Sequence, residues 1–232
     1  MRILVVTAHP DDVDFGAAGT VATWISEGHE VAYCVCTSGD AGAGPEGLPR
    51  DQVPALREAE QRAAATVLGV TDVTFLRHPD GRVQPTIELR RDISRVIRKF
   101  RPDRVVGQSP ERTWDRIYAS HPDHLAAGEA TACAVYPDAR NAFAHPELLE
   151  EGLEPWTVRE MWVMATPTGA TIAIDITDAI DKKVAALRAH ASQTSGMDDL
   201  DGRMRGWAQG TASAMGLEAG RMAEAFRVVD TR

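Results

Sequence analysis

Residues 3–12 read ILVVTAHPDD and decide the fold. The run Ile3–Thr7 is mainly apolar and rich in β-branched residues, which is typical of a short buried strand. A helix is expected over Gly16–Glu27, because apolar side chains recur there every four positions and Gly28 follows as a stop signal. The stretch therefore predicts a strand that leads through a short turn into a helix.

The same alternation continues along the chain. Further strands are expected over Val31–Thr37, Val73–Leu76 and Arg104–Gly107, and near Glu160 and Thr171. Further helices are expected over Arg50–Leu68, from a cap at Thr86 as far as Phe100, and from about Ser120 and Asp178. This pattern predicts an α/β fold with a mostly parallel sheet covered on both faces, whose ligands bind outside the carboxyl ends of the strands. The sequence shows no internal repeat and no long linker, so residues 1–232 are expected to form one domain.

The composition is that of an ordinary globular protein. Hydrophobic residues make up 44% of the 232 residues and charged residues 25%. The formal net charge of −9 and the lack of a lysine/arginine run argue against a nucleic-acid partner. The apolar stretches are strand-sized, far short of the ~20 residues of a membrane helix. Three cysteines do not suggest a disulfide framework. We therefore expect a cytoplasmic protein without membrane insertion.

The turn after the first expected strand carries an imidazole and two carboxylates. A dinucleotide-binding protein has a glycine-rich sequence at this turn, whereas this chain has His9, Pro10, Asp11 and Asp12. A histidine and one carboxylate suit zinc, and a second carboxylate beside the metal can take a proton from bound water. Pro10 restricts where these groups point.

A second cluster, SHPDH over residues 120–124, opens an alanine-rich helix. Ser120 is expected to cap this helix, with Asp123 three residues on in a capping-box-like position. His121 and His124 are three residues apart and can face the same side of the first turn. They can supply one metal ligand and one catalytic imidazole.

Each cluster has a plain structural explanation when taken alone. His9 can be a buried, hydrogen-bonded histidine, and Asp11 or Asp12 can cap the following helix. Together the clusters favour a site, because two histidines and one carboxylate with a fourth position for water form a known catalytic zinc pattern.

At these residues the chain resembles the LmbE/PIG-L family of zinc-dependent N-deacetylases. The paired His-Pro-Asp motifs carry the resemblance, which extends over most of the chain. Supporting segments are Phe15-Gly16, Gly19-Thr20, Arg57-Glu58-Ala59-Glu60, Leu68-Gly69, Pro79-Asp80-Gly81 and His190-Ala191-Ser192-Gln193. The resemblance implies a Rossmann-like, three-layer α/β/α fold, a substrate that contains an N-acylated amino sugar, and frequent homo-oligomers.

The resemblance also implies residue roles. It implies a zinc ion held by His9, Asp12 and His124. It makes Asp11 the general base, and makes His121 a stabiliser of the oxyanion or a proton donor that Asp123 orients. Arg57 and Asp80 match positions that hold the substrate in relatives.

Two positions depart from the family pattern. Relatives usually have glutamate where this chain has Asp14, a change beside the metal site that removes no ligand. Some sugar-thiol deacetylases have tyrosine two residues before the first histidine of the second motif, where this chain has Ala119, and the nearest tyrosine is Tyr118. The exact substrate and any tyrosine role therefore stay open.

Other readings of the residues also stay open. The protein can be an amidase acting on a thiol conjugate, a non-enzymatic Rossmann-like module with a structural metal, or a metal-dependent phosphoesterase, which more often has two metals. Two nitrogens and one carboxylate also suit iron(II) or cobalt. Residues 138–155 and 195–216 are open to interpretation as a lid or a subunit contact.

Overall fold

The computed structural model describes residues 1–42, 48–114, 117, 120–164 and 169–232. The strands in that part of the chain are β1 (Arg2–Thr7), β2 (Glu30–Thr37), β3 (Asp72–His78), β4 (Arg104–Gly107), β5 (Glu160–Met164), β6 (Ile172–Asp175) and β7 (Ala223–Asp230). The helices are α1 (Asp12–Ser26), α2 (Val53–Leu68), α3 (Ile87–Phe100), α4 (Pro122–Cys133), α5 (Glu147–Glu150), α6 (Ile180–Ala189), α7 (Ala191–Thr194) and α8 (Leu200–Ala214). Short helical turns cover Arg50–Gln52, Ala134–Asp138 and Thr177–Ala179.

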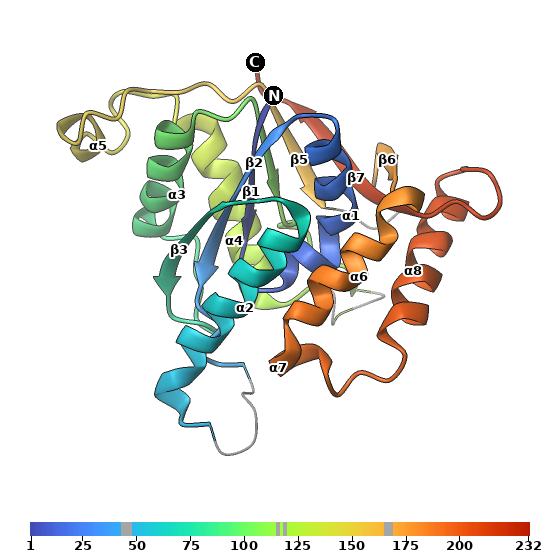
Figure 1. The fold of residues 1–232 in the computed structure, drawn as a ribbon. Coiled ribbons are helices and arrows are strands. Elements are labelled where there is room, and N and C mark those ends of the chain that lie inside the picture. The colour runs from blue at the N-terminus through green and yellow to red at the C-terminus, as the bar shows by residue number, and fades with distance from the viewer. Residues whose placement is uncertain (43–47, 115–116, 118–119, 165–168) are drawn as a thin grey trace.

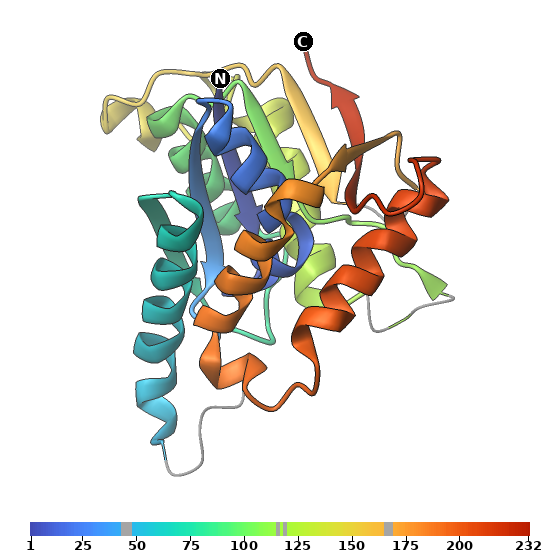
Figure 2. The ribbon, with the colours of Figure 1, turned by 45° about the vertical axis from the view of Figure 1, so that its right-hand side comes forward.

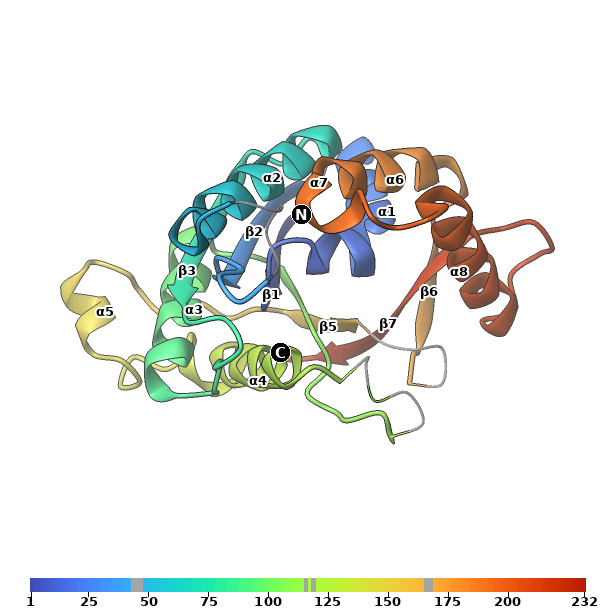
Figure 3. The same cartoon turned by 90° about the horizontal axis from the view of Figure 1, so that it is seen from below.

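The strands form one mixed, mostly parallel sheet in the order β3-β2-β1-β4-β5-β7-β6. The five strands from β3 to β5 are parallel to their neighbours, whereas β7 runs antiparallel to both β5 and β6. Helices α1, α2 and α6 cover one face, and α3 and α4 cover the other (Figures 1 and 3). The predicted α/β fold, a mostly parallel sheet with helices on both sides, is confirmed.

The apolar run of β1 explains why the sheet is covered on both faces. Ile3 and Val5 pack in the core under α1 and α2, and Leu4 and Val6 pack in a second core under α3 and α4. All four side chains are at most 1% exposed. A strand that is buried on both faces needs a continuous apolar run, which is the pattern that the sequence shows.

The topology places the functional edge of the sheet. From β1 the chain moves outward to β2 and β3, and then returns to β4 on the other side of β1. Ligands of such sheets bind where the strand order reverses, at the carboxyl ends of the two central strands. The turn after β1 holds residues 8–11, and the loop after β4 leads to α4. Both termini lie at the opposite edge (Figure 1).

Several elements differ from the sequence prediction. Strand β7 and helix α8 were not predicted, and α8 occupies most of residues 195–216. Helix α8 packs beside α6 and β7, at the end of the sheet that carries β6 (Figure 2). Helix α1 begins at Asp12 rather than at Gly16, so the turn after β1 is tighter than the sequence indicated.

The irregular segment 138–155 is fastened to α3 by a buried arginine. The Arg98 side chain is 1% exposed. Its guanidinium donates to backbone carbonyls at five positions of the segment, which are Asp138, Ala139, Asn141, Ala144 and Leu153. A buried guanidinium needs such acceptors, and each carbonyl that it satisfies fixes the backbone there.

Candidate active site

The turn after β1 brings Asp11 to the amino terminus of α1. Asp11 has φ 90° and ψ −26°, a left-handed backbone conformation that residues other than glycine rarely adopt. Its carbonyl oxygen accepts from the N–H groups of Asp14 and Phe15 at 2.8 and 3.0 Å. A strained backbone that the surrounding contacts hold in place is common at functional sites.

The second cluster begins α4, although not with the expected cap. His121 is the N-cap, and its Nδ1 accepts from the N–H of Asp123 at 3.2 Å. The expectation of a Ser120 cap is wrong: its hydroxyl oxygen instead accepts from the N–H of Thr113 at 2.8 Å. Pro122 follows at the first helical position, where its missing N–H leaves no hydrogen bond unmade.

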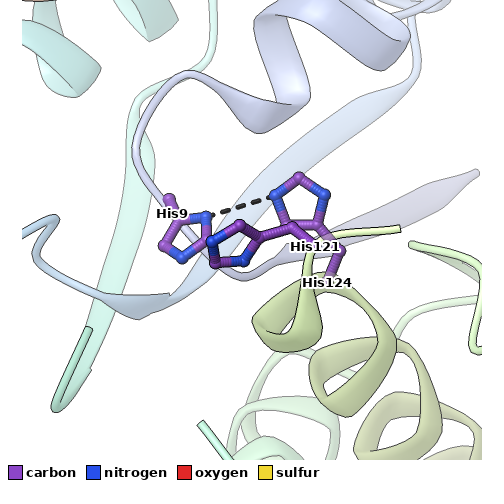
Figure 4. A group of neighbouring side chains, drawn as sticks. All are labelled: His9, His121 and His124. Carbon is purple, nitrogen blue, oxygen red and sulfur yellow. Dashed lines mark hydrogen bonds between the residues drawn. The ribbon is translucent and has the colours of Figure 1, made fainter. Parts of the chain in front are cut away.

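The two clusters meet at three imidazole rings (Figure 4). The ring centroid of His9 lies 5.0 Å from that of His121 and 5.2 Å from that of His124, and the latter two rings are 5.2 Å apart. Nitrogens of the three rings all lie within 4.8 Å of one another. The switch point of the sheet therefore brings together histidines that are more than 100 residues apart in the sequence.

The side chains of the expected ligand set lie close together. His9 Nδ1 lies 3.2 Å from His124 Nε2. Asp12 Oδ2 lies 3.3 Å from His9 Nδ1, and Asp12 Oδ1 lies 3.0 Å from His124 Nε2. Ligands of a tetrahedral zinc ion, at bond lengths near 2.0–2.1 Å, are about 3.3 Å from one another. The three side chains therefore lie near that spacing, with different oxygens of Asp12 facing the two rings.

The far nitrogen of His9 is held by carboxylates. His9 Nε2 lies 3.1 Å from Asp80 Oδ1 and 3.2 Å from Asp123 Oδ2. The Asp123 carboxylate also accepts from the N–H of Gly81 at 2.7 Å. A carboxylate that accepts from one ring nitrogen directs the lone pair of the other toward a metal.

This arrangement assigns Asp80 and Asp123 contacts that the sequence did not suggest. The Asp123 carboxylate contacts His9, and only the backbone N–H of Asp123 contacts the His121 ring. The Asp80 carboxylate touches the candidate metal ligand His9 and also accepts from the N–H of Ala41 at 2.9 Å. The one available signal was His78-Pro79-Asp80, a third His-Pro-Asp tripeptide, whose Pro-Asp-Gly continuation is also explained by a turn.

Arg57 of α2 clamps the turn that carries Asp11. Its Nη2 donates to the carbonyl oxygen of Pro10 at 2.7 Å and to Asp11 Oδ2 at 3.1 Å. The two side chains of the Arg57–Asp11 pair are 5% and 15% exposed. In this arrangement the Asp11 carboxylate lies next to the candidate metal ligand Asp12, and the guanidinium fixes one of its oxygens.

Burial and neighbouring charges shift the pKa values of His9, Asp11 and Asp12. Burial and the nearby charge of Asp12 raise the pKa of Asp11 to about 7, although Arg57 opposes the shift. Burial opposes protonation of His9, but hydrogen bonds with Asp12 and Asp80 outweigh it and raise its pKa to about 11. The pKa of Asp12 is lowered, because its contacts with His124 and His9 outweigh the effect of burial. A divalent cation is the natural counter-charge for carboxylates gathered in this way.

His121 is the histidine of the cluster that favours the neutral form. Burial and the neighbouring rings of His9 and His124 lower its pKa. A neutral ring whose Nδ1 accepts a hydrogen bond carries its proton on Nε2. The exposed His121 ring can therefore donate its Nε2–H to a bound group.

Tyr118 and Ala119, which bear on the departure from the tyrosine pattern, lie outside the described residues. Asp14 is fully buried, and its Oδ2 accepts from His190 Nε2 and Gln61 Nε2, each at 2.8 Å. The change from glutamate therefore concerns a buried support beneath the turn rather than the surface of the site.

Comparison with known proteins gives consistent relatives. A family model described as PIG-L, GlcNAc-PI de-N-acetylase, matches residues 4–135. The diacetylchitobiose deacetylase of Thermococcus kodakarensis is 31% identical in an alignment that covers 83% of this chain and 70% of that protein. The 1D-myo-inositol 2-acetamido-2-deoxy-alpha-D-glucopyranoside deacetylase of Rhodococcus erythropolis is 32% identical, with coverages of 84% and 81%.

A solved structure agrees with these relatives. The N,N'-diacetylchitobiose deacetylase from Pyrococcus horikoshii, complexed with its inhibitor MPG, superposes with a TM-score of 0.88 at 28% identity. The alignment covers 99% of this chain and 84% of that one. Because the family model matches more than half of the chain, and two relatives at 31% and 32% identity align with more than four fifths of it, the chain belongs to the PIG-L family.

Proposed function

We propose that the protein is a zinc-dependent hydrolase that removes an acetyl group from the nitrogen of a small amino-sugar substrate. The observation that carries the proposal is the ligand triangle of His9, Asp12 and His124, beside an Asp11 carboxylate that is held by Arg57. The names of the two relatives specify acetylated sugars, diacetylchitobiose and a 2-acetamido-2-deoxy-glucopyranoside. Family membership supports the same reaction class.

In this proposal His9, Asp12 and His124 hold the metal. A zinc ion bound there supplies an electrophile for the amide carbonyl and makes a water molecule acidic enough to react near neutral pH. The carboxylates of Asp80 and Asp123 fix the His9 ring, so that its Nδ1 presents a lone pair to the ion. Nitrogen and carboxylate ligands in this number favour zinc, and the choice of metal belongs to the proposal.

Asp11 is proposed as the general base. Its carboxylate takes a proton from the attacking water as the carbon–oxygen bond forms. It then returns this proton to the nitrogen as the carbon–nitrogen bond breaks, which releases acetate and the free amine. Arg57 holds one carboxylate oxygen at 3.1 Å and thereby aims the other. The left-handed backbone of Asp11, directly before Asp12 in the turn, supports this role.

His121 and the remaining residues complete the proposed site. The N–H on His121 Nε2 donates to the carbonyl oxygen as negative charge develops there, and the backbone N–H of Asp123 keeps the ring in place. Arg57 of α2 and Asp80 of the turn after β3 are proposed to contact the sugar as well as their partners within the protein.

The described strands and helices bear on two further expectations, the number of domains and membrane insertion. A single sheet takes strands from β1 to β7, which supports treating residues 1–232 as one domain. Among the described residues no helix has the length and apolar character needed to span a bilayer. The cytoplasmic location, the lack of a nucleic-acid partner and homo-oligomer formation stay predictions.

A substrate panel tests the proposed reaction. The zinc-loaded protein is incubated with N-acetylglucosamine, N,N'-diacetylchitobiose, N-acetylglucosamine glycosides and N-acetylated thiol conjugates, and free amine and acetate are measured. We expect equal amounts of both products from at least one sugar member, because hydrolysis of one amide releases one of each. Preferential cleavage of a thiol conjugate would show that the substrate is such a conjugate rather than a simple amino sugar. A panel without any product at full zinc loading would contradict the proposal.

A further inference from the structure

A chain of buried side chains joins His190 to the backbone of Asp11. His190 Nε2 donates to Asp14 Oδ2 at 2.8 Å, and Gln61 Nε2 donates to the same oxygen at 2.8 Å. Gln61 Oε1 accepts from the N–H of Asp11, also at 2.8 Å. The side chains of His190, Asp14 and Gln61 are all fully buried. The chain of contacts therefore runs from the junction of α6 and α7, through α1 and α2, to the turn that carries the proposed base.

We infer that His190 is a positioning residue for Asp11. This inference rests on the proposed function, since it concerns the residue that acts there as the base. Asp11 has φ 90°, and a non-glycine residue keeps this conformation only where its surroundings impose it. The Gln61 amide is one of the groups that impose it, because it holds the N–H of the strained residue.

The Asp14 carboxylate sets which end of the Gln61 amide faces Asp11. An amide side chain has a donor end and an acceptor end, whereas an ionised carboxylate only accepts. Asp14 therefore draws Nε2 of Gln61 toward itself and leaves Oε1 for the N–H of Asp11. The reversed amide would place a donor against the N–H of Asp11, and that contact would be lost.

His190 is what keeps the Asp14 carboxylate in this role. Asp14 Oδ2 receives both of its described hydrogen bonds from His190 and Gln61, and Oδ1 has no partner among the described residues. A buried carboxylate that loses one of two donors is under-satisfied and rearranges or admits water. Either change frees the Gln61 amide, and through it the backbone of Asp11.

The junction of α6 and α7 is built to place His190. Ser192 donates from its backbone N–H and its hydroxyl to the Glu60 carboxylate at 2.7 and 2.6 Å. Glu60 lies next to Gln61 on α2, so the junction is tied to the same helix that holds Asp11. Helices α1, α2, α6 and α7 lie on one face of the sheet (Figure 3). The segment 190–193 thus contacts both helices that support Asp11: His190 binds Asp14 of α1, and Ser192 binds Glu60 of α2.

Arg57 and His190 act on different parts of Asp11. Arg57 holds the carboxylate and the Pro10 carbonyl, whereas the His190 chain ends on the backbone N–H. Removal of the His190 donor is therefore expected to misplace the base while leaving the Arg57 ion pair and the ligand triangle able to form. The effect should fall on kcat, with little change in KM or in zinc content.

The test compares two substitutions of His190 in the zinc-loaded full chain. His190→Leu fills the site without a donor, and His190→Gln offers an amide N–H at nearly the reach of the lost Nε2. For a small displacement of a catalytic group we expect H190L to lower kcat about 10- to 100-fold, with KM and zinc content within about twofold of wild type. We expect H190Q to recover kcat to within about threefold of wild type, because the donor is restored.

Thr194→Val is the matched control at the same junction. The Thr194 hydroxyl donates to the carbonyl oxygens of Leu187 and His190, and touches neither Asp14 nor Gln61. T194V is expected to lower Tm while kcat stays within about twofold, because it leaves the side chains of His190, Asp14 and Gln61 and their hydrogen bonds in place. An equal loss of kcat in T194V and H190L would show a merely structural role and overturn the inference.

A crystal structure of H190L separates this inference from the proposed function. Loss of the Asp11–Gln61 hydrogen bond, or a change in φ of Asp11, supports the inference even if the wild type hydrolyses no panel member. If Asp11 and Gln61 keep their wild-type arrangement in H190L, the inference is overturned. A wild-type kcat in H190L would overturn it as well. If H190L does not fold, His190→Asn, whose shorter amide does not reach Asp14, takes its place in both measurements with the same expected outcomes.

Discussion

Asparagine in place of Asp11 is expected to lower kcat about 1,000-fold, the typical contribution of a general base. The substitution removes the group that takes the proton and changes little else. Asparagine tolerates positive φ better than most residues, so it suits the φ of 90° at this position. Its side-chain oxygen can still accept from Arg57, which now holds Asp11 Oδ2 at 3.1 Å. The fold and the neighbouring ligand triangle should therefore survive.

The measurement is kcat for amine release by zinc-loaded D11N, with zinc content and Tm determined on the same sample. Asp198→Asn, at an exposed position before α8, is the control for loss of one carboxylate and should behave as wild type. A D11N protein that keeps full zinc and a kcat within about tenfold of wild type would remove Asp11 from the role of base.

Alanine in place of His124 is expected to abolish both metal binding and turnover. His124 supplies one of three protein ligands, and its Nε2 lies within 3.0 to 3.2 Å of the other two. Loss of a supporting contact to a ligand already costs about 10- to 100-fold in metal affinity, so loss of the ligand itself should cost more than about 100-fold. Amine release should then fall to the rate of the metal-free protein.

Zinc affinity by competition with a chelator, and amine release at matched zinc concentrations, check this prediction. His29→Ala is the matched control, because His29 is partly exposed just before β2, at the end of the sheet opposite the cluster. Wild-type zinc affinity in H124A would exclude His124 from the ligand set. Wild-type affinity with lost activity would instead assign it to the chemistry.

The sequence predicted the parts of this molecule that depend on local pattern. The apolar run of β1, the helix stop at Gly28 and the Thr86 cap of α3 each fix structure through neighbours a few residues away, and the structure has all three. The sequence also favoured one site that joins the two histidine clusters. The structure shows why they meet: β1 and β4 end side by side at the switch point of the sheet.

The parts that depend on tertiary contact were not predictable in the same way. Strand β7 pairs antiparallel with both β5 and β6, and no local pattern specifies such partners. The orientation of His9 depends on Asp80 and Asp123, which reach it from two distant loops. The support of Asp11 by Gln61, Asp14 and His190 depends on the packing of three helices. The family resemblance includes the segment that begins at His190, but only the structure shows that the His190 ring contacts Asp14.

The measurement that tests the central claim most directly is a zinc titration of activity. The protein is stripped with a chelator, which is then removed, and amine release from a cleaved panel substrate is followed as zinc is added back. A single catalytic metal held by His9, Asp12 and His124 predicts no release without metal and a linear rise that ends at one zinc ion per chain. Full activity in the stripped protein, or a rise that continues to two zinc ions per chain, would contradict a single catalytic metal held by His9, Asp12 and His124.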